Sequence, residues 1–188
     1  IHGVGVLSRR FRLPVYITPQ TMSAAGPSLG DLHEVHHFNP GQGFALDGLH
    51  VHPFSVSHDA VDPVGFTIQD RKVKIGIATD LGVATQLVCH HLRGCTLMIL
   101  EANHDRKMLE DGPYPWELKQ RIRSRHGHLS NEESRDLLSE VLDGTLEHVV
   151  VAHVSEKNNL PERAVSVVRE ALSDHKARLR VALQDAPG

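Results

Sequence analysis

The sequence predicts a layered α/β (α+β) sandwich in a single domain of residues 1–188, and three observations lead to this prediction. The chain has 188 residues, of which 40% are hydrophobic, so it can bury a substantial core. Residues 34–79 are typical of short strands separated by hairpin-length turns. After Asp80, apolar stripes with helical spacing alternate with strands, which favours helices packed on a sheet.

The first half of the chain is rich in strand patterns. Asp47-Gly48 is a favoured two-residue hairpin turn, and Asp70-Arg71 also separates two apolar runs at hairpin distance. We expect a helical turn at 19–25 and strands at 15–18, 34–38, 43–46, 49–56, 65–69 and 72–79.

The second half alternates helices with strands. Apolar side chains at helical spacing, Leu87 and Leu92 among them, predict a helix at 83–92 that Gly94 ends. The pattern SNEE at 130–133 is a capping box, which opens another helix. We expect helices at 83–92, 114–126, 130–142 and from about 161 to 172, and strands at 96–102, 147–153 and 178–184.

Composition and charge exclude several classes of protein. The longest apolar runs have only strand length, and Arg9, Arg10 and Arg12 stand where a signal peptide is apolar, so we expect a cytoplasmic protein without a membrane span. Cys89 and Cys95 do not form a CxxC pair, and we expect reduced, buried thiols. The formal net charge of −3 argues against a protein that coats nucleic acid but permits a local basic patch.

Histidine is the unusual feature of the composition. The chain contains 15 histidines, and imidazole is the commonest metal ligand and general acid or base. Three segments that run from a strand into a turn end in a possible metal ligand: His58 in SVSHDA, Asp80 in IATDLG and His153 in VVAHVS. Ligands presented from strand ends suit a rigid metal site. Each also has an ordinary interpretation, as a turn histidine, a helix N-cap and a strand-end histidine respectively.

Five segments carry a resemblance to a known family: FSVSHDAVDPVGFTI, KIGIATDLG, LEANHD, GHLSN and VVVAHVSEKNNLPE. In this order and at these separations they resemble the metallo-β-lactamase superfamily, in its WalJ/YycJ-type branch, which implies a four-layer αββα sandwich. Ile1 and Gly3 match the residues that follow the family's main metal-binding signature, HxHxDH, and the sequence does not contain that signature. The resemblance therefore implies that residues 1–188 are roughly the C-terminal three quarters of the family domain.

The resemblance also implies roles for the three strand-end residues. His58 corresponds to a histidine of the first metal site, Asp80 to the carboxylate that bridges both metals, and His153 to the last ligand of the second site. Two divalent ions, zinc or manganese, share a hydroxide that attacks the substrate, and the branch is associated with 5′-to-3′ exonuclease action on DNA. Asp80 is thus both a ligand and a catalytic residue. Because each ion has only two of these ligands, we expect residues 1–188 to bind metal weakly.

Two other functions stay open. The same scaffold hosts hydrolysis of thioesters, lactones and small phosphodiesters, because fold does not fix function. Alternatively, the chain is an inactive scaffold or partner domain whose exposed inner sheet pairs with another chain, which includes the formation of a homo-oligomer.

Further candidates surround these ligands. Asp59 orients a ligand imidazole or caps a turn. His128 precedes a helix N-terminus, where it orients substrate or protonates a leaving oxygen, or only closes the loop. The segments LEANHD, GHLSN and EKNNLPE contribute cleft-lining or turn-stabilising residues, namely Asn103, His104, Ser130, Asn131, Asn158 and Asn159. Basic residues on the helix at 114–126 form a possible phosphate-binding stripe or a solvated face, and these are Arg121, Arg123 and Arg125.

Four other histidines are not part of any matched motif. His50 and His52 share one face of a predicted strand, a spacing able to bind zinc, but we expect a solvated sheet face. His90 and His91 are adjacent on a predicted helix and point apart, so we do not expect them to share a ligand.

Overall fold

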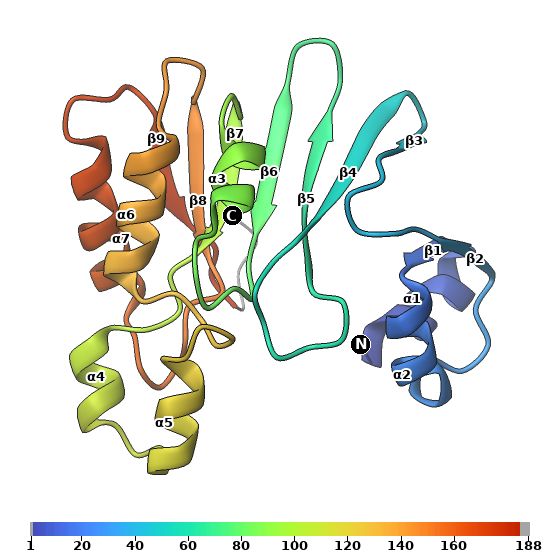
Figure 1. Ribbon diagram of the computed structural model, residues 1–188, viewed down its shortest axis with the longest axis horizontal. Helices are drawn as coiled ribbons and strands as arrows, with labels where there is room; N and C mark the ends of the chain where they lie inside the picture. Colours follow the sequence, from blue (N-terminus) through green and yellow to red (C-terminus); the bar gives the residue numbers. More distant parts are fainter. Residues whose placement is uncertain (1, 185–188) are drawn as a thin grey trace.

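The computed structural model describes residues 2–184 (Figure 1). The helices are α1 (His2–Phe11), α2 (Pro19–Leu29), α3 (Gln86–Leu92), α4 (Arg106–Asp111), α5 (Trp116–Ile122), α6 (Asn131–Val141) and α7 (Pro161–Arg169), followed by a 3₁₀ turn, η1 (Glu170–Leu172). The strands are β1 (Pro14–Ile17), β2 (Glu34–His37), β3 (Phe44–Leu46), β4 (Leu49–Ser55), β5 (Val64–Gln69), β6 (Lys74–Ala78), β7 (Leu97–Glu101), β8 (His148–Ala152) and β9 (Arg178–Val181).

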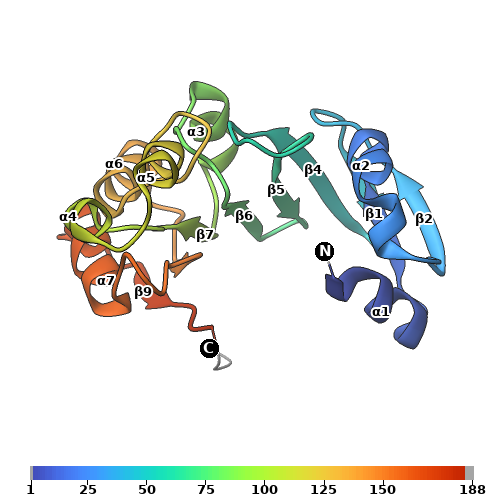
Figure 2. The ribbon, with the colours of Figure 1, turned by 90° about the horizontal axis from the view of Figure 1, so that it is seen from below.

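A seven-stranded mixed sheet forms the centre of the molecule, in the order β3-β4-β5-β6-β7-β8-β9. Strands β3 to β6 pair antiparallel, and strands β6 to β9 pair parallel. Helices α3, α6 and α7 cover one face of this sheet (Figures 1 and 2). Because β6, β7 and β8 run in the same direction, the residues at their carboxyl ends lie together at one edge of the sheet.

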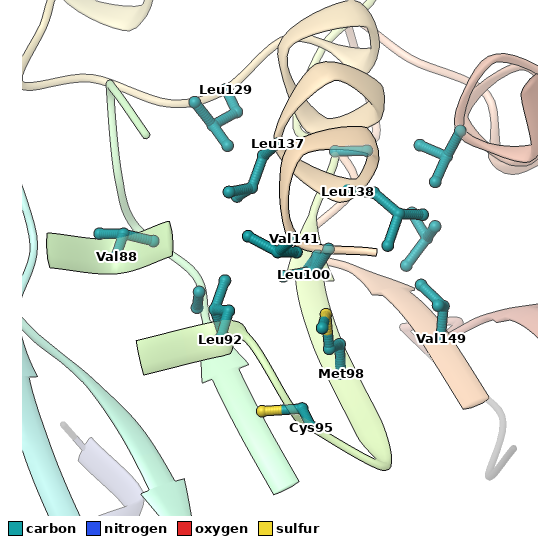
Figure 3. Packing of buried hydrophobic residues seen from close by; sticks show 14 of the residues in the cluster. Val88, Leu92, Cys95, Met98, Leu100, Leu129, Leu137, Leu138, Val141 and Val149 are labelled. Carbon is teal, nitrogen blue, oxygen red and sulfur yellow. The ribbon is translucent and has the colours of Figure 1, made fainter. Parts of the chain in front are cut away.

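The hydrophobic core lies between the sheet and these helices (Figure 3). Its centre contains the side chains of Met98, Leu100, Leu137, Leu138 and Val141, each of them at most 2% exposed. Burying one such side chain contributes about 1.5–3 kcal/mol to folding. Cys89 and Cys95 belong to the same cluster as free buried thiols, so the expectation of reduced, buried cysteines is confirmed.

A smaller unit formed by α1, α2 and the parallel pair β1-β2 lies beside the β3 end of the large sheet (Figure 2). Aromatic contacts attach it: the ring of Tyr16 stacks on Phe44 at 5.1 Å between centroids, and Phe38 meets Phe66 edge-on at 5.8 Å. The layered α/β architecture is thus confirmed. In residues 2–184 its layers are one large sheet with its helices and this smaller sheet with two helices. The single-domain organisation stays a prediction.

Local turn and cap chemistry follows the sequence closely. Asp47 and Gly48 adopt positive φ angles of 48° and 84° and connect the paired residues Leu46 and Leu49, which confirms the two-residue hairpin. The capping box at Ser130 is present: its side chain accepts from Glu133 N at 3.2 Å, and the Glu133 side chain accepts from Ser130 N at 2.8 Å.

Several expected boundaries were wrong: the helical turn expected at 19–25 is a helix that continues to Leu29, and the strand expected at 178–184 ends at Val181. The helix expected at 83–92 begins only at Gln86, because the side chain of Thr85 caps it. Leu87, expected on the apolar stripe of this helix, is 47% exposed. The helix expected at 114–126 ends at Ile122, because the next residues fold into turns in which Gly127 N donates to Ser124 O. The strand expected at 72–79 begins at 74, since Asp70 Oδ1 accepts hydrogen bonds from two backbone amides and widens the turn.

Two helices were not expected at all, α1 and α4. Helix α4 is a short helix of 6 residues that starts at an aspartate N-cap, Asp105, whose side chain accepts from Met108 N. None of the helices in residues 2–184 combines the length and the apolar character needed to cross a bilayer.

Candidate metal centre

The three strand-end residues of the sequence analysis meet at the edge of the sheet. His58 follows β4, Asp80 follows β6 and His153 follows β8. Asp80 Oδ1 lies 3.7 Å from Nε2 of His58 and 3.7 Å from Nε2 of His153. One carboxylate oxygen thus lies equally close to two imidazoles that come from separate parts of the chain.

Asp80 and His153 hold strained backbone conformations. Their φ angles are 56° and 55°, in the left-handed region that non-glycine residues rarely adopt. Such a conformation costs about 1–3 kcal/mol and persists where the surroundings compensate for it. Here compensation comes from a buried carboxylate, since Glu101 Oε2 accepts from Asp80 N at 2.9 Å and from His153 Nδ1 at 3.1 Å.

Glu101, the last residue of β7, is the centre of this arrangement. It is fully buried and accepts five hydrogen bonds, from the backbone amides of Asp80, Leu81 and Leu129 and from Nδ1 of His128 and His153. Burial raises its pKa, but the hydrogen bonds from the two imidazoles and from Leu129 N outweigh burial and hold the pKa below its usual value. Glu101 is therefore a buried anion with matched donors.

Sequence reasoning missed Glu101. The signal was available in the segment LMILE, because an acidic residue that ends an apolar buried strand must find donors in the fold.

Hydrogen bonds fix which nitrogen each imidazole presents. His58 Nδ1 lies 2.9 Å from Gly127 O, and His153 Nδ1 lies 3.1 Å from Glu101 Oε2. Both acceptors lack a proton, so Nδ1 carries the hydrogen and Nε2 is left as the ligand atom. The hydrogen bond to Glu101 raises the pKa of His153, against the opposing effect of burial.

The donor set fits divalent metal ions. Ligand atoms on one tetrahedral ion lie about 3.4 Å apart when each bond is about 2.1 Å, which is close to the 3.7 Å between Asp80 Oδ1 and each Nε2. His58, Asp80 and His128 can each offer one ligand atom within 4.8 Å of the others, as can Glu101, His128 and His153. His128 lies between the other two rings, with centroids 4.9 Å from His58 and 5.0 Å from His153.

A cavity of about 330 Å³ opens beside these rings. One wall is α5 with the segment before it, and this wall supplies Tyr114, Leu118, Arg121 and Ile122. The guanidinium of Arg121 donates to Asp59 in an ion pair, and this hydrogen bond holds the pKa of Asp59 below its usual value. The partner that orients His58 is the Gly127 carbonyl, and Asp59 faces the Nε2 edge of His58, with Oδ1 3.5 Å from Nε2.

Among the remaining candidate residues, some line the cavity and others stabilise the structure around it. Asn103 lines the cavity and donates to the His153 carbonyl at 3.1 Å. Ser130 is the N-cap of α6, and Asn131 and Asn159 exchange side-chain amide hydrogen bonds at 2.8 and 3.0 Å. Asn158 and His104 are buried outside the cavity lining, at 1% and 2% exposure.

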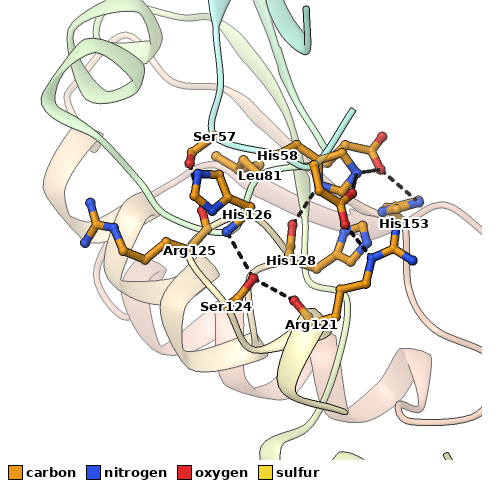
Figure 4. Close-up of polar contacts among 12 residues, drawn as sticks. Ser57, His58, Leu81, Arg121, Ser124, Arg125, His126, His128 and His153 are labelled. Carbon is orange, nitrogen blue, oxygen red and sulfur yellow. Dashed lines mark hydrogen bonds and ion pairs between the residues drawn. The ribbon is translucent and has the colours of Figure 1, made fainter. Parts of the chain in front are cut away.

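The basic residues do not form one stripe. Arg121 lies on the cavity side of α5, whereas Arg123 lines a different pocket together with His104 and Glu133. Arg125 lies beyond the end of the helix, and its side chain points away from the three imidazoles (Figure 4). The stripe expected on a helix through residue 126 is therefore wrong, because α5 ends too early to align these side chains.

Residues 1–153 match the family model described as the β-lactamase superfamily domain. The chain is 32% identical over 176 residues to "Exodeoxyribonuclease YycJ" of Bacillus anthracis, covering 93% of this chain and 67% of that protein. It is 34% identical over 168 residues to "Exodeoxyribonuclease WalJ" of Streptococcus pneumoniae, covering 87% of this chain and 62% of that protein. The chain thus spans about two thirds of the length of these relatives.

Solved structures share the fold at low sequence identity. The metallo-β-lactamase fold protein YhfI of Bacillus subtilis superposes with a TM-score of 0.67 at 13% identity, covering 95% of this chain and 66% of that one. Zn²⁺-bound PqqB of Methylobacterium extorquens gives a TM-score of 0.65 at 15% identity, covering 97% and 66%. The predicted fold class is confirmed, and the chain belongs to the β-lactamase superfamily, in the branch that contains YycJ and WalJ.

Proposed function

We propose that this chain belongs to a metal-dependent phosphodiesterase that degrades DNA from the 5′ end. One observation carries the proposal: Asp80 Oδ1 lies 3.7 Å from Nε2 of both His58 and His153, while buried or backbone acceptors hold the Nδ1 atoms. The relatives at 32% and 34% identity are named exodeoxyribonucleases, which supports DNA as the substrate. A DNA substrate also agrees with the cytoplasmic location expected from the sequence.

Zinc or manganese would be held by the three strand-end residues. His58 and Asp80 would hold one ion, and Asp80 and His153 would hold the other. Two such metal ions would polarise a phosphoryl oxygen as Lewis acids and would supply an activated water molecule.

The protein groups around the cavity bind and orient the phosphodiester. Arg121 presents a guanidinium at the cavity wall, where it can bind a phosphate oxygen in place of Asp59. The ring of Tyr114 and the apolar side chains of Leu118 and Ile122 line the same wall and suit the stacking of a base.

His128 is placed to donate the proton that the leaving oxygen needs. Its Nδ1 lies 3.2 Å from Glu101 Oε2, and its ring lines the cavity. When the phosphorus–oxygen bond breaks, His128 gives the proton on Nε2 to the leaving oxygen, and the Glu101 carboxylate stabilises the positive charge on the ring before that transfer. Glu101 is thus a positioning residue and His128 the general acid.

The first experiment is the zinc and manganese content per chain, measured on protein purified without chelator, and the matched control is Asp80→Asn. Asparagine tolerates a positive φ, so the variant keeps the backbone and loses only the charge. Because each ion has only two of the strand-end ligands, we expect weak but measurable metal binding in the wild-type chain and at least tenfold weaker binding in Asp80→Asn. DNA labelled at the 5′ or the 3′ end then tests polarity, and the 5′ label is expected to be released first.

Each other outcome favours a different function. Metal binding with intact DNA but cleavage of a thioester, a lactone or a small phosphodiester would replace the nuclease with another superfamily hydrolase. A chain that binds no metal would support the inactive scaffold or partner domain.

A further inference from the structure

A second cavity, of about 460 Å³, adjoins the metal centre at His153. His153 and Ser155 line both this cavity and the one that Arg121 lines. Its volume lies within the range of about 300–1,000 Å³ that is usual for small-molecule sites. The two cavities therefore meet at a residue of the metal centre, and a chain molecule bound in one of them can continue into the other. The second cavity is called the β9 cavity, after the strand that precedes one of its walls.

Two apolar segments form the walls of the β9 cavity. One is the loop from β8 to α7, with Val154, Leu160 and Pro161, and the other is the segment that follows β9, with Ala182 and Leu183. Leu160 and Leu183 are 48% and 50% exposed. A ligand group with an apolar face would remove this surface from water, which favours binding.

Hydrogen bonds hold both walls in place. Leu160 N donates to Asn159 Oδ1 at 2.9 Å, and Asn159 Nδ2 donates to the Ala102 carbonyl at 2.9 Å. On the other wall, Ala182 N donates to the Val151 carbonyl at 2.8 Å. The cavity is thus formed before a ligand arrives, so binding does not have to order its walls first.

The charge of the lining distinguishes the two cavities. Among the described residues, the lining of the β9 cavity contains no arginine or lysine, and it includes the carboxylate of Glu156. A phosphate group bound there would meet a negative charge without a cation of the lining to offset it. The other cavity presents the guanidinium of Arg121, which suits a phosphate. The β9 cavity therefore suits the uncharged part of a nucleotide, its base and sugar.

We propose that the β9 cavity binds one nucleoside of the DNA strand, on the other side of the cleaved phosphodiester from the nucleoside in the Arg121 cavity. A phosphodiester joins two nucleosides, and two cavities that meet at His153 give each of them a place. Apolar side chains can contact the face of every base, so we expect little preference for sequence. This inference rests on the proposed function and adds a second nucleoside site to it.

The test is photo-cross-linking of the whole chain to thymidine oligonucleotides. Their methylenephosphonate linkages keep the charge of a phosphodiester but resist cleavage, and each strand carries one diazirine-labelled base at the first, second or third position from the 5′ end. The carbene formed on irradiation inserts into aliphatic side chains, and mass spectrometry identifies the modified peptide. We expect one label position to modify residues 114–122 and the adjacent position to modify residues 154–161 or 182–184.

The other outcomes separate this inference from the proposed function. Cross-links to residues 114–122 without any to residues 154–161 or 182–184 would overturn the β9 site and leave DNA as the substrate. A strand that cross-links to neither wall would overturn both the β9 site and the proposed function.

Two variants and a matched control measure what the apolar walls contribute. Leu160→Ser changes one wall and Leu160→Ser/Leu183→Ser changes both, and each side chain is about half exposed, so the fold does not depend on it. Leu87→Ser is the control, because Leu87 is 47% exposed on α3 and lines neither cavity. We expect the Kd of the uncleaved oligonucleotide to rise about threefold in the single variant and about tenfold in the double variant, and to stay unchanged in Leu87→Ser. A double variant with the Kd of the wild type would overturn the proposal.

Discussion

The two histidine groups differ in how their rings are held. At the metal centre, Nδ1 of His58, His128 and His153 each meets an oxygen acceptor, either the Gly127 carbonyl or Glu101. On β4 and α3, the rings of His52 and His91 are held by stacking, and no ring nitrogen of that group forms a hydrogen bond within residues 2–184.

This difference separates imidazoles that are oriented before a metal binds from imidazoles that are held only by stacking. An imidazole whose Nδ1 is fixed loses little freedom when Nε2 binds an ion, whereas a stacked surface ring must first select a rotamer. We therefore expect metal binding at the centre to depend strongly on its hydrogen-bond acceptors, and the stacked rings on β4 and α3 to contribute little to it.

Among the variants that test this comparison, Glu101→Gln should have the largest effect on stability and on metal affinity. The amide removes the negative charge and turns an NH₂ group toward backbone donors, which leaves buried polar groups unpaired. We expect a loss of about 2–3 kcal/mol in the free energy of unfolding and a 10–100-fold loss of metal affinity at the centre. Urea denaturation and zinc titration measure the two losses.

The matched control is Glu147→Gln on the exposed surface, for which neither quantity is expected to change. Equal stabilities of Glu101→Gln and the wild type would show that the five hydrogen bonds to Glu101 do not organise the centre.

The contrast also marks what the sequence could predict. His58, Asp80 and His153 were found because strand-end ligands sit in short segments that resemble a known family. Glu101 was not found, because its importance comes from five donors contributed by three separate segments, and only the folded chain brings them together.

Helix boundaries show the same limit. The capping box at Ser130 is local chemistry, and it was predicted correctly. The end of α5 at Ile122 depends on tertiary contacts, such as the hydrogen bond from Ser57 Oγ to Arg125 O at 2.8 Å. Because α5 ends there, Arg121 lines the cavity and Arg123 lies elsewhere. The spacing of these residues in the sequence could not predict this.

Arg121→Ala and Arg123→Ala form a pair that tests the cavity side. Both remove one positive charge from neighbouring surface positions, but only Arg121 lines the cavity with the imidazoles. If the proposed function holds, Arg121→Ala weakens DNA binding and reduces the salt slope of log K by about 1, while Arg123→Ala leaves both nearly unchanged. Binding of labelled DNA over a range of salt concentrations measures this, and equal effects would remove Arg121 from the substrate site.

His104 gives a smaller, pH-dependent effect behind the cavity. Burial lowers the pKa of His104 below its usual value, so the folded state favours neutral imidazole. The unfolded state binds a proton below about pH 6.5, so stability due to this group is complete above that pH and is lost as the pH falls toward the lowered pKa, by at most about 1.4 kcal/mol per pH unit. His104→Asn should flatten this part of the profile in urea denaturation between pH 7 and 5. An unchanged slope would show that His104 titrates normally in the folded chain.

His52→Gln should have the smallest effect, both without metal and with it. The variant loses one stacked ring pair, worth about 0.5–1.5 kcal/mol, and leaves no buried charge unpaired, since His52 is only partly buried. Zinc that binds only the folded chain raises the melting temperature through mass action, and His52→Gln should keep this rise, because its ring lies outside the metal centre. Glu101→Gln should lose most of the rise. Melting curves of the wild type and both variants over a zinc series therefore compare the oriented imidazoles with the stacked ones, and a His52→Gln chain that lost the rise would show that the stacked rings also hold zinc.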